Sequence, residues 1–281
     1  MHTQAAYRSI LDHPWRIAAL LGIVANLVVN YASSAGMYHS MNVADTSDRY
    51  ASLFTPAGYA FSIWGVIYGS TLVYAVAALL PSQWDVRMHD RVAPWLLLTN
   101  VLAGVWLALF TSEALGPSVL VILAMLIATG LAYSIASEHL ASEHLSRRWR
   151  APFSLWLGWL ALASLANLSI ALVAAWGSDS FFGGQVFTCL LLLAAATFAL
   201  LVNAAASDPI VPLVIAWGAT AIAVARWEEA TLVAVVAALV AIKAVLWTIT
   251  TLVFKFFPIP ARYQRAADKA LHYDPSHPEG L

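Results

Sequence analysis

The sequence predicts an all-α polytopic integral membrane protein, a bundle of helices that cross a lipid bilayer. Of the 281 residues, 61% are hydrophobic and only 10% are charged, and the mean hydropathy is +0.76. A soluble domain carries about 25% charged residues, so this chain has too few polar groups to cover a globular surface. The apolar residues also gather in long runs, as membrane-spanning helices require.

These apolar runs predict eight spans. A spanning helix needs about 20 apolar residues, within a range of roughly 17 to 25. The seventh run is short and the eighth is long, and a count of seven that merges or drops one of them is the main alternative. The runs lie at residues 14–33, 56–81, 92–112, 117–137, 151–176, 184–206, 209–226 and 229–257.

Basic residues are distributed unevenly among the connections. With eight spans, only Arg49 and Arg226 lie on one side of the membrane, and Lys243 lies within a span. Because cytoplasmic segments carry the excess of Lys and Arg, we expect both termini in the cytoplasm, with the bacterial inner membrane as the bilayer. The other basic residues share the cytoplasmic side: Arg8, Arg16, Arg87, Arg91, Arg147, Arg148, Arg150, Lys255, Arg262, Arg265 and Lys269.

The remaining composition narrows the function classes. A formal net charge of -1 argues against nucleic acid as a partner. Cys189 is the single cysteine and forms no disulfide within the chain. The first apolar run is long enough to span, and no small-residue cleavage site follows it, so we expect no cleaved signal peptide. No metal-spaced Cys/His cluster, phosphate-binding loop or Ser/His/Asp arrangement is evident in the sequence.

Residues 54–68, which read FTPAGYAFSIWGVIY, carry aromatic rings on one helix face. Pro56 and Gly58 mark a turn just before a helix, since Pro is well tolerated in a first helical turn. A stripe of rings at positions i, i+3 and i+7 is by itself typical of core packing with an interfacial belt. Here the stripe is formed by Phe61, Trp64 and Tyr68.

This stretch resembles the second-helix signature of the TspO/MBR family, the tryptophan-rich sensory proteins, which reads roughly PPxWVFxPVWTxLY. Pro56 and Phe61 keep the family's spacing, as do Trp64 and Tyr68, while the gap between Phe61 and Trp64 is one residue shorter. Tyr59 stands where the family has a Trp.

Two further motifs follow in the family's order. Trp106 and Phe110 in the third span keep the spacing of an N-x-x-W-S-x-L-F-F pattern, although Asn100 lies six residues before the Trp rather than three. The fifth span opens with PFSLW, close to the family's P-Y-x-x-W. Its Trp, the aromatic residue three positions on and an Asn displaced by about one turn are Trp156, Trp159 and Asn167.

The resemblance covers residues 14–176 and implies a TspO-like five-helix core whose cavity, closed by the first loop, binds flat apolar ligands. Residues 1–13 are then a cytoplasmic N-terminus, 177–260 a three-helix extension and 261–281 a cytoplasmic tail. No cofactor is expected to be obligatory, and a porphyrin or haem-like tetrapyrrole is the implied ligand. The implied ligand-binding residues are Tyr59, Phe61, Trp64, Tyr68, Asn100, Trp106, Phe110, Trp156, Trp159 and Asn167.

The resemblance favours a binding protein, a sensor or carrier of tetrapyrrole-like molecules, over an enzyme. One alternative is an accessory or structural subunit of a larger membrane complex, and another is a membrane enzyme that acts on a porphyrin or lipid. The enzyme would need polar side chains that converge on the cavity. The expected partners are the lipid bilayer, an apolar small molecule, and a second copy or another membrane subunit.

Lys243 lies near the middle of the eighth predicted span. An ionisable group inside a bilayer is costly and is by default a candidate for function. The alternative is a lysine that pairs with backbone carbonyls or reaches an aqueous edge along its apolar stem. A retinal Schiff base is disfavoured, because no carboxylate lies in the middle of any span to serve as a counterion.

Two polar segments leave alternatives open. The first loop, about residues 34–55, is either a lid over a cavity or a solvated connection. The repeat SEHL-A-SEHL places His139 and His144 five residues apart, which is about 140° of rotation on a helix, so they do not share a face. His139 and Glu143 do share one, at i and i+4, and a solvated helix end is favoured over a metal or haem site.

Overall fold

The computed structural model describes residues 9–37, 42–50 and 52–256, and within them the only regular elements are helices. This confirms the all-α class. Most of the predicted N-terminal segment 1–13 and all of the predicted tail 261–281 lie outside the described residues, as does the side chain of Lys255.

The eight predicted apolar runs correspond one to one to eight long helices. Within the described residues, seven helical stretches are long and apolar enough to cross a membrane, with α3 counted together with the 3₁₀ turn before it as Gly58–Ala78. α8 is a shorter apolar helix of 17 residues, about 25 Å at 1.5 Å per residue. The helices are α1 (Pro14–Ser34), α3 (Ile63–Ala78), α4 (Arg87–Thr111), α5 (Leu115–Ser142), α6 (Ala151–Trp176), α7 (Gln185–Ala206), α8 (Ile210–Arg226) and α9 (Thr231–Phe256).

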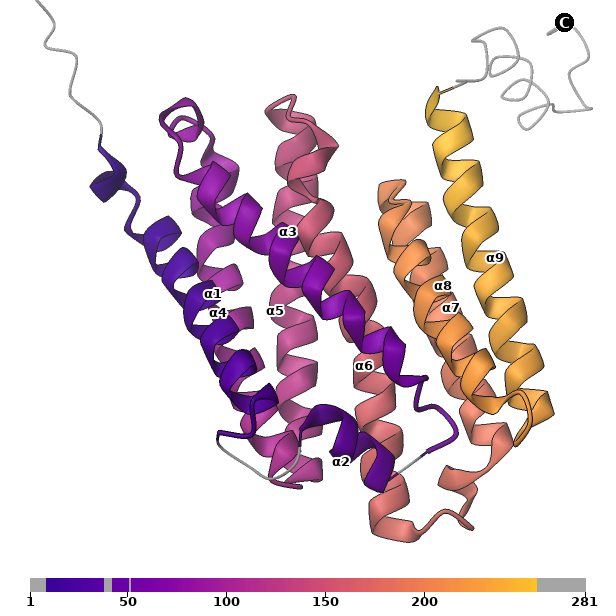
Figure 1. Ribbon diagram of the computed structural model, residues 1–281. Helices are drawn as coiled ribbons and strands as arrows, with labels where there is room; N and C mark the ends of the chain where they lie inside the picture. The colour runs from indigo at the N-terminus through magenta and orange to yellow at the C-terminus, as the bar shows by residue number, and fades with distance from the viewer. Residues whose placement is uncertain (1–8, 38–41, 51, 257–281) are drawn as a thin grey trace, which may run out of the picture.

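The helices run alternately up and down, so the two ends of the described chain lie at the same, upper end of the bundle (Figure 1). We call upper the end at which α1, α4, α6 and α8 begin, and lower the opposite end. Short 3₁₀ turns occupy several connections: η1 (Ile10–Asp12), η2 (Gly58–Ser62), η3 (Pro81–Gln83), η4 (Arg147–Trp149) and η5 (Phe181–Gly183).

The first loop contains a short helix, α2 (Val43–Arg49), which sequence reasoning did not predict. Its start is encoded locally. The Asn42 side chain accepts from the backbone N–H groups of Ala44 and Asp45 at 2.8 and 3.1 Å, and the Asp45 carboxylate accepts from the Asn42 N–H at 3.0 Å. This reciprocal arrangement is a capping box, so the N-x-x-D spacing was a usable signal.

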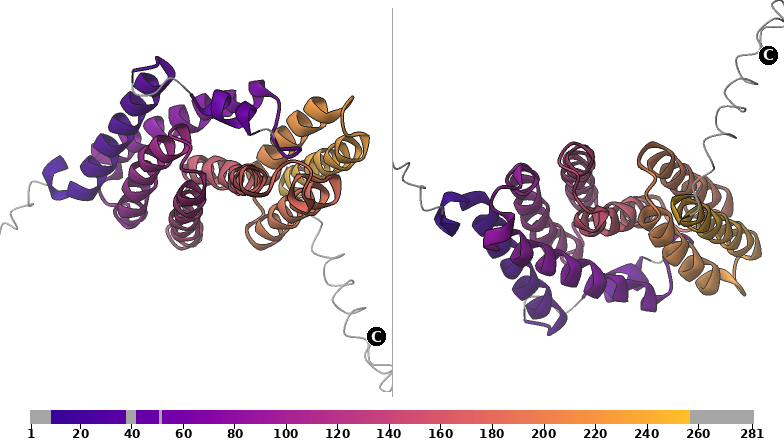
Figure 2. Two further views of the ribbon diagram at one scale, coloured as in Figure 1. Left: turned by 90° about the horizontal axis from the view of Figure 1, so that it is seen from below. Right: turned by 90° about the horizontal axis from the view of Figure 1, so that it is seen from above.

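α6 is the central element that joins the two halves of the molecule. It packs against α3 and α5 on one side and against α7 and α8 on the other, and it lies between them when the bundle is viewed along its axis (Figure 2). Its sequence explains this position, because it is apolar on nearly every face, as a fully enclosed helix must be.

Two glycines allow α6 and α8 to approach closely. A Cβ atom at Gly158 would lie 2.9 Å from the Cβ of Val214, and one at Gly218 would lie 2.4 Å from Cδ1 of Leu162. A larger residue at either position would force the helices or the facing side chain to move. The extension is therefore packed directly onto the core.

A buried ion pair also joins the core to the extension, at the upper end. Arg150 Nε lies 3.2 Å from Asp208 Oδ2, and both side chains are buried. The hydroxyls of Ser154 and Tyr133 donate to the same carboxylate oxygen at 2.6 and 3.0 Å, while Oδ1 accepts from the backbone N–H of Ile210 at 2.8 Å. Such full hydrogen bonding is what makes a buried ion pair tolerable.

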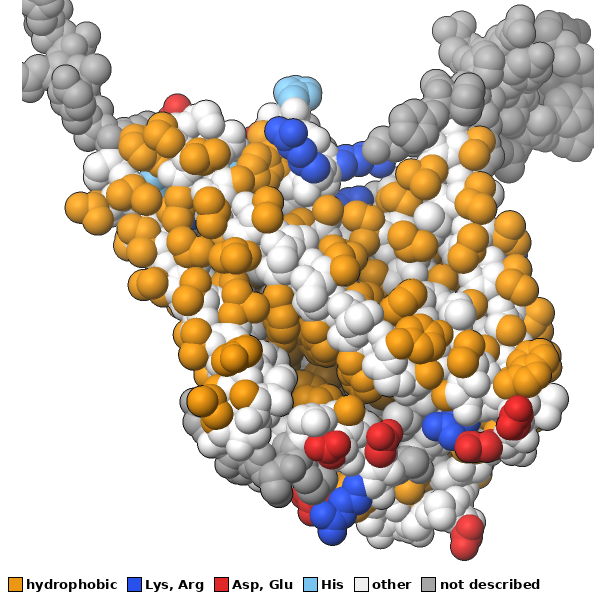
Figure 3. All heavy atoms as spheres, viewed as in Figure 1, with side chains coloured by type: hydrophobic (Ala, Val, Ile, Leu, Met, Phe, Trp, Pro, Cys, Tyr) orange, Lys and Arg blue, Asp and Glu red, His pale blue; other side chains and the backbone are white. Residues whose placement is uncertain are grey.

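The outer surface matches a bilayer environment. Large apolar side chains cover the flanks of the helices, and the charged side chains gather near the two ends (Figure 3). Leu21, Val73, Leu120 and Leu201 are among the exposed apolar residues. A monomeric soluble protein rarely exposes so continuous an apolar surface, so this belt is the part that lipid covers in an integral membrane protein.

Candidate functional site

Trp64 of α3 is the centre of a cluster of aromatic rings from η2, α3 and α6. Its ring stacks on that of Tyr68, with centroids 5.3 Å apart and planes at 17°. The rings of Trp156 and Trp159 meet it edge-on at 5.4 and 6.0 Å, and Phe61 packs edge-on against Trp159 at 6.2 Å. Pairs at these distances stabilise one another, so five of the candidate rings form one continuous cluster.

Trp106 and Phe110 of α4 form a second pair, stacked with centroids 5.1 Å apart. The indole N–H of Trp106 donates to Asn167 Oδ1 at 2.8 Å, and the Asn167 amide donates to Ser118 Oγ at 2.9 Å. A buried polar group left without a partner costs about 1–3 kcal/mol, so these bonds let Asn167 face an apolar space while they link α4, α5 and α6.

Above α2 lies a small, partly enclosed cavity of about 40 Å³. A small-molecule site normally offers roughly 300–1,000 Å³, so this cavity is too small for a flat conjugated ligand with the side chains placed as they are. Six of the candidate residues line it, namely Phe61, Trp64, Trp106, Phe110, Trp159 and Asn167.

An open groove of about 460 Å³ adjoins this cavity on the side of α1. Figure 3 shows the surface hollowed here, between α1 and α3 and above α2. Phe61, Trp64 and Trp106 line both spaces, so their rings form the partition between them. Tyr68 lines the groove but not the cavity, and its hydroxyl donates to Asn30 Oδ1 at 3.4 Å.

Trp156 and Asn100 lie outside both spaces. Trp156 is 1% exposed and stands behind Trp64, where its indole N–H donates to Thr71 Oγ1 at 2.9 Å. Asn100 accepts from the Asn26 amide at 3.1 Å and so bridges α1 and α4. Both are supporting residues here, since their polar atoms bond other helices or their own helix.

α8, which no motif in the sequence reaches, forms one wall of the cavity through Gly218 and Ile222. The indole N–H of Trp217, on the same helix, donates to the carbonyl of Ala60 at 3.1 Å. The candidate Tyr59 lies outside the cavity and is 45% exposed, with its ring edge-on to Trp217 at 5.4 Å. The extension therefore takes part in the site.

Two more bonds fasten the second half of the first loop to α8. The backbone N–H of Ala57 donates to the carbonyl of Ala221 at 3.1 Å, and Arg226 Nη2 donates to the carbonyl of Thr55 at 3.2 Å. Pro56, which the sequence placed at the turn before the second span, also lines the cavity. The remaining walls come from residues that sequence reasoning did not single out: Val43, Ser47, Phe54, Thr55, Leu162, Ala163, Ala166 and Ile170.

α2 covers the lower end of the cavity as a lid. Thr46 and Ser47 point inward and are 0% and 3% exposed. Arg49, at the end of α2, forms an ion pair of 2.8 Å with Glu113 in the α4–α5 turn, but its side chain is 58% exposed. Exposed pairs contribute only about 0–1 kcal/mol, so this pair holds the lid weakly.

Trp159 leaves a hydrogen-bond donor unused at the cavity. The residue is 2% exposed, and its indole nitrogen has no hydrogen-bond partner among the described residues. Trp159 lies on the α6 face that lines the cavity together with Ala163, Ala166 and Ile170. A buried donor without a partner is unfavourable, so an acceptor atom on a ligand would stabilise it.

Lys243 lies on the exposed surface of α9 and lines neither space. Its ammonium nitrogen is 5.8 Å from the ring centroid of Trp247, one turn nearer the upper end. Thr248, the next residue, donates to the carbonyl of Pro209 at the start of α8. The amine thus reaches toward the polar end of the bundle, as expected for a lysine with its stem in apolar surroundings.

His139 and Glu143 contact each other as their spacing predicts, with Nδ1 and Oε1 2.6 Å apart. The part of the chain that the structure describes contains no group of three or more His, Cys, Asp or Glu side chains that could hold a metal ion. The pair lies at the end of α5, at the upper end of the bundle.

Comparison with known proteins supports the resemblance seen in the motifs. The sequence model of a family described as TSPO-like protein matches residues 16–250, a range that includes α7, α8 and most of α9 as well as the five-helix core. No curated protein and no solved structure matches the chain. Because the match spans most of the sequence, the chain belongs to the TSPO-like protein family.

Proposed function

We propose that this protein is a membrane-embedded sensor or carrier that binds flat apolar ligands, with tetrapyrroles as the leading class. The observation that carries the proposal is the placement of Trp64. It stacks on Tyr68, lines both the groove beside α1 and the cavity above α2, and is only partly buried. A partly exposed indole beside a groove of about 460 Å³ is a suitable surface on which a planar ligand can stack.

The polar groups around the site favour binding over catalysis. Asn167 and Ser118 are hydrogen-bonded to each other, and Asn167 also accepts from Trp106. The Trp159 indole N–H has no partner among the residues that the structure describes and can donate to a ligand, and the Tyr68 hydroxyl lies at the groove. These groups can orient a ligand that carries a carbonyl or carboxylate, but none is arranged as a nucleophile with an adjacent base.

Porphyrin titration tests the proposal. The chain is purified in mild detergent, and the shift of the porphyrin absorbance band is followed with increasing protein. Trp64→Leu removes the stacking surface, and Trp15→Leu, at a side chain 54% exposed on α1, is the matched lipid-facing control. Each aromatic contact contributes roughly 0.5–1.5 kcal/mol, so Trp64→Leu should weaken binding by about two- to tenfold while Trp15→Leu leaves it unchanged.

Equal affinities for the two variants would mean that the rings near Trp64 only pack the bundle. Copurification of stoichiometric partner subunits with no bound porphyrin would favour the alternative, an accessory subunit of a larger membrane complex.

We also propose that both termini face the cytoplasm of a bacterial cell and that the protein lies in the inner membrane. The support is the excess of basic residues at the upper end, where both described ends of the chain lie (Figure 1). A reporter fused after Leu281 should be active in its cytoplasmic form, and a periplasmic signal would reject the orientation.

A further inference from the structure

A second groove, of about 610 Å³, lies at the upper end between α3 and the start of α6. It shares no residue with the aromatic cavity or with the groove beside α1. It opens toward the membrane-facing surface, where Val73 is 70% exposed and Leu80 is 50% exposed. The proposed ligand-binding function does not use this groove.

The wall of the groove is an apolar strip along α3. Gly69, Val73 and Ala77 follow one another at intervals of four residues, so they share a helix face. From Gly69 to the end of α3 at Ala78 the strip extends about 14 Å at 1.5 Å per residue, close to half of the roughly 30 Å hydrocarbon core. A Cβ atom at Gly69 would meet nothing within 4 Å, so the strip has free space beside it.

The upper end of the groove is polar and positively charged. Ser82 and Gln83 of η3 line one side, and Arg148 and Trp149 of η4 line the other. The guanidinium carbon of Arg148 lies 5.6 Å from the Trp149 ring centroid. An arginine over an interfacial tryptophan places a cation at headgroup depth.

Of the three arginines that precede α6, only Arg148 points its charge at this groove. Arg147 donates to the carbonyl of Ser207 at 3.3 Å, and Arg150 pairs with Asp208. Within the described residues Arg148 has no ion-pair partner, and its side chain is exposed. Its positive charge is therefore available to an anion.

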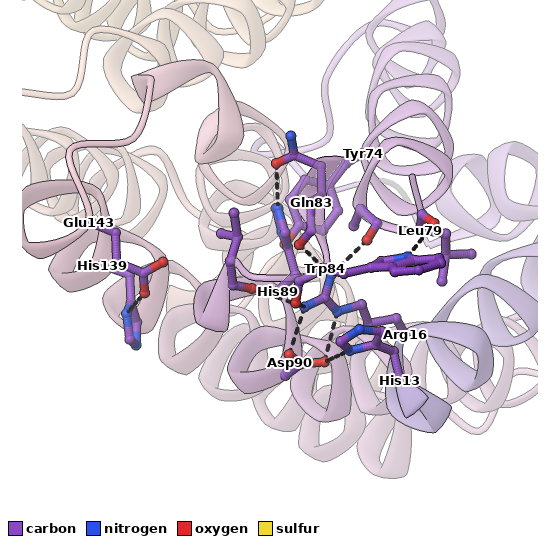
Figure 4. Close-up of polar contacts among 12 residues, drawn as sticks. His13, Arg16, Tyr74, Leu79, Gln83, Trp84, His89, Asp90, His139 and Glu143 are labelled. Carbon is purple, nitrogen blue, oxygen red and sulfur yellow. Dashed lines mark hydrogen bonds and ion pairs between the residues drawn. The ribbon is translucent and has the colours of Figure 1, made fainter. Parts of the chain in front are cut away.

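Buried arginines hold both sides of the groove in place. Arg16 donates to the carbonyls of Ala78 and Gln83 at 2.8 and 2.9 Å, and its charge is balanced by Asp90, whose two oxygens it contacts at 2.7 and 2.6 Å. Figure 4 shows these bonds converging on the Arg16 guanidinium, which lies between Asp90 and the η3 turn. The Arg150 pair fixes η4 in the same way, so the polar end is preorganised.

We propose that this groove binds an anionic phospholipid, with the phosphate at Arg148 and one acyl chain along α3. Charge complementarity selects this occupant. The groove supplies an uncompensated cation, neutral donors at Ser82 and Gln83, and an apolar strip as long as one leaflet. Basic pockets between transmembrane helices are recognised sites for acidic headgroups. A second copy of the chain is disfavoured as the occupant, because it would bring another basic end against this one.

Native mass spectrometry of the full chain tests the headgroup. The protein in detergent is mixed with equal amounts of phosphatidylglycerol and phosphatidylcholine that carry the same acyl chains. The wild type should retain the anionic lipid about fivefold over the zwitterionic one, the effect of one basic residue near a headgroup. Arg148→Gln should bring that ratio near one. Arg87→Gln, an exposed arginine at the same end but outside the groove, should leave it unchanged.

Gly69→Leu tests the acyl-chain strip. Leucine is a better helix former than glycine, and a Cβ atom at Gly69 meets nothing within 4 Å, so the bundle should fold while the added side chain occupies the strip. Retention of both lipids should then fall together, and soluble glycerol phosphate should not displace the lipid from the wild type. Equal retention of the two lipids by the wild type, equal ratios for Arg148→Gln and Arg87→Gln, or displacement by glycerol phosphate would overturn the proposal.

Discussion

At the upper end of the bundle, Arg16 and Arg150 are buried, and each is balanced by a carboxylate and bonded to further oxygen atoms. At the lower end, just above α2, the side chains are mostly aromatic and apolar, a cavity remains, and the indole N–H of Trp159 has no partner within the described residues. Buried charges that are fully paired leave no group available for a ligand, whereas unfilled space and an unused donor can accept one. The upper ion pairs therefore act as a structural anchor, whereas the lower cavity is the candidate site.

The largest effect is expected at the upper anchor. Asp208→Asn removes the carboxylate but keeps the size of the side chain, which leaves the buried charge of Arg150 without compensation. Breaking a buried pair by removing one partner costs about 3–5 kcal/mol. Unfolding in detergent, followed by circular dichroism, should show this loss. A loss of stability no larger than that expected for an exposed ion pair would mean that water reaches Arg150.

The contact between α6 and α8 is expected to be the next most sensitive feature. Gly158→Ala places a methyl group 2.9 Å from Val214 Cβ and 3.2 Å from the carbonyl oxygen of Val211. Overpacking of this kind costs about 1–3 kcal/mol. Gly104→Ala on α4, where a Cβ would meet nothing within 4 Å, is the matched control and should be neutral or slightly stabilising. Equal effects on the unfolding midpoint would show that α8 is loosely packed against the core.

A smaller effect is expected where α8 holds the loop. Arg226→Gln removes the bond from the guanidinium to the carbonyl of Thr55, so the lid should open more often. Ser47→Cys, at a residue 3% exposed, reports opening by its rate of thiol labelling in a Cys189→Ser background. Loss of a bond worth about 1 kcal/mol should raise the labelling rate about fivefold. An unchanged rate would place the moving part of the lid elsewhere.

The smallest effect is expected for Arg49→Gln, which breaks the pair between α2 and Glu113. Because the arginine side chain is 58% exposed, the loss of stability should stay below about 1 kcal/mol and diminish further at high salt. A loss as large as that of Asp208→Asn would contradict the contrast between the two ends.

Local patterns determined most of the fold. The run 151–176 coincides with α6, because Pro152 lies in its first turn and Gly177 ends it with φ of +87°. The run that begins at residue 56 is different, since α3 begins at Ile63 after a 3₁₀ turn. Ala57 donates to the Ala221 carbonyl of α8, and the Ala60 carbonyl accepts from Trp217 of α8. These bonds fix the segment before α3 against α8, and no local pattern predicts such a contact.

The candidate site likewise has features that follow from local sequence and features that depend on tertiary packing. The spacing of Trp64 and Tyr68 placed both rings on one face of α3, because helical periodicity is a local property. Whether a ring lines the cavity depends on how neighbouring helices are rotated. Trp156 therefore turns to Thr71 while Trp159 reaches the cavity. The sequence alone predicted the helices, the charge asymmetry and the family resemblance, because these depend on local patterns. Only tertiary packing brought Gly218 and Ile222 of α8 to the cavity wall, since contacts between distant segments depend on the whole bundle.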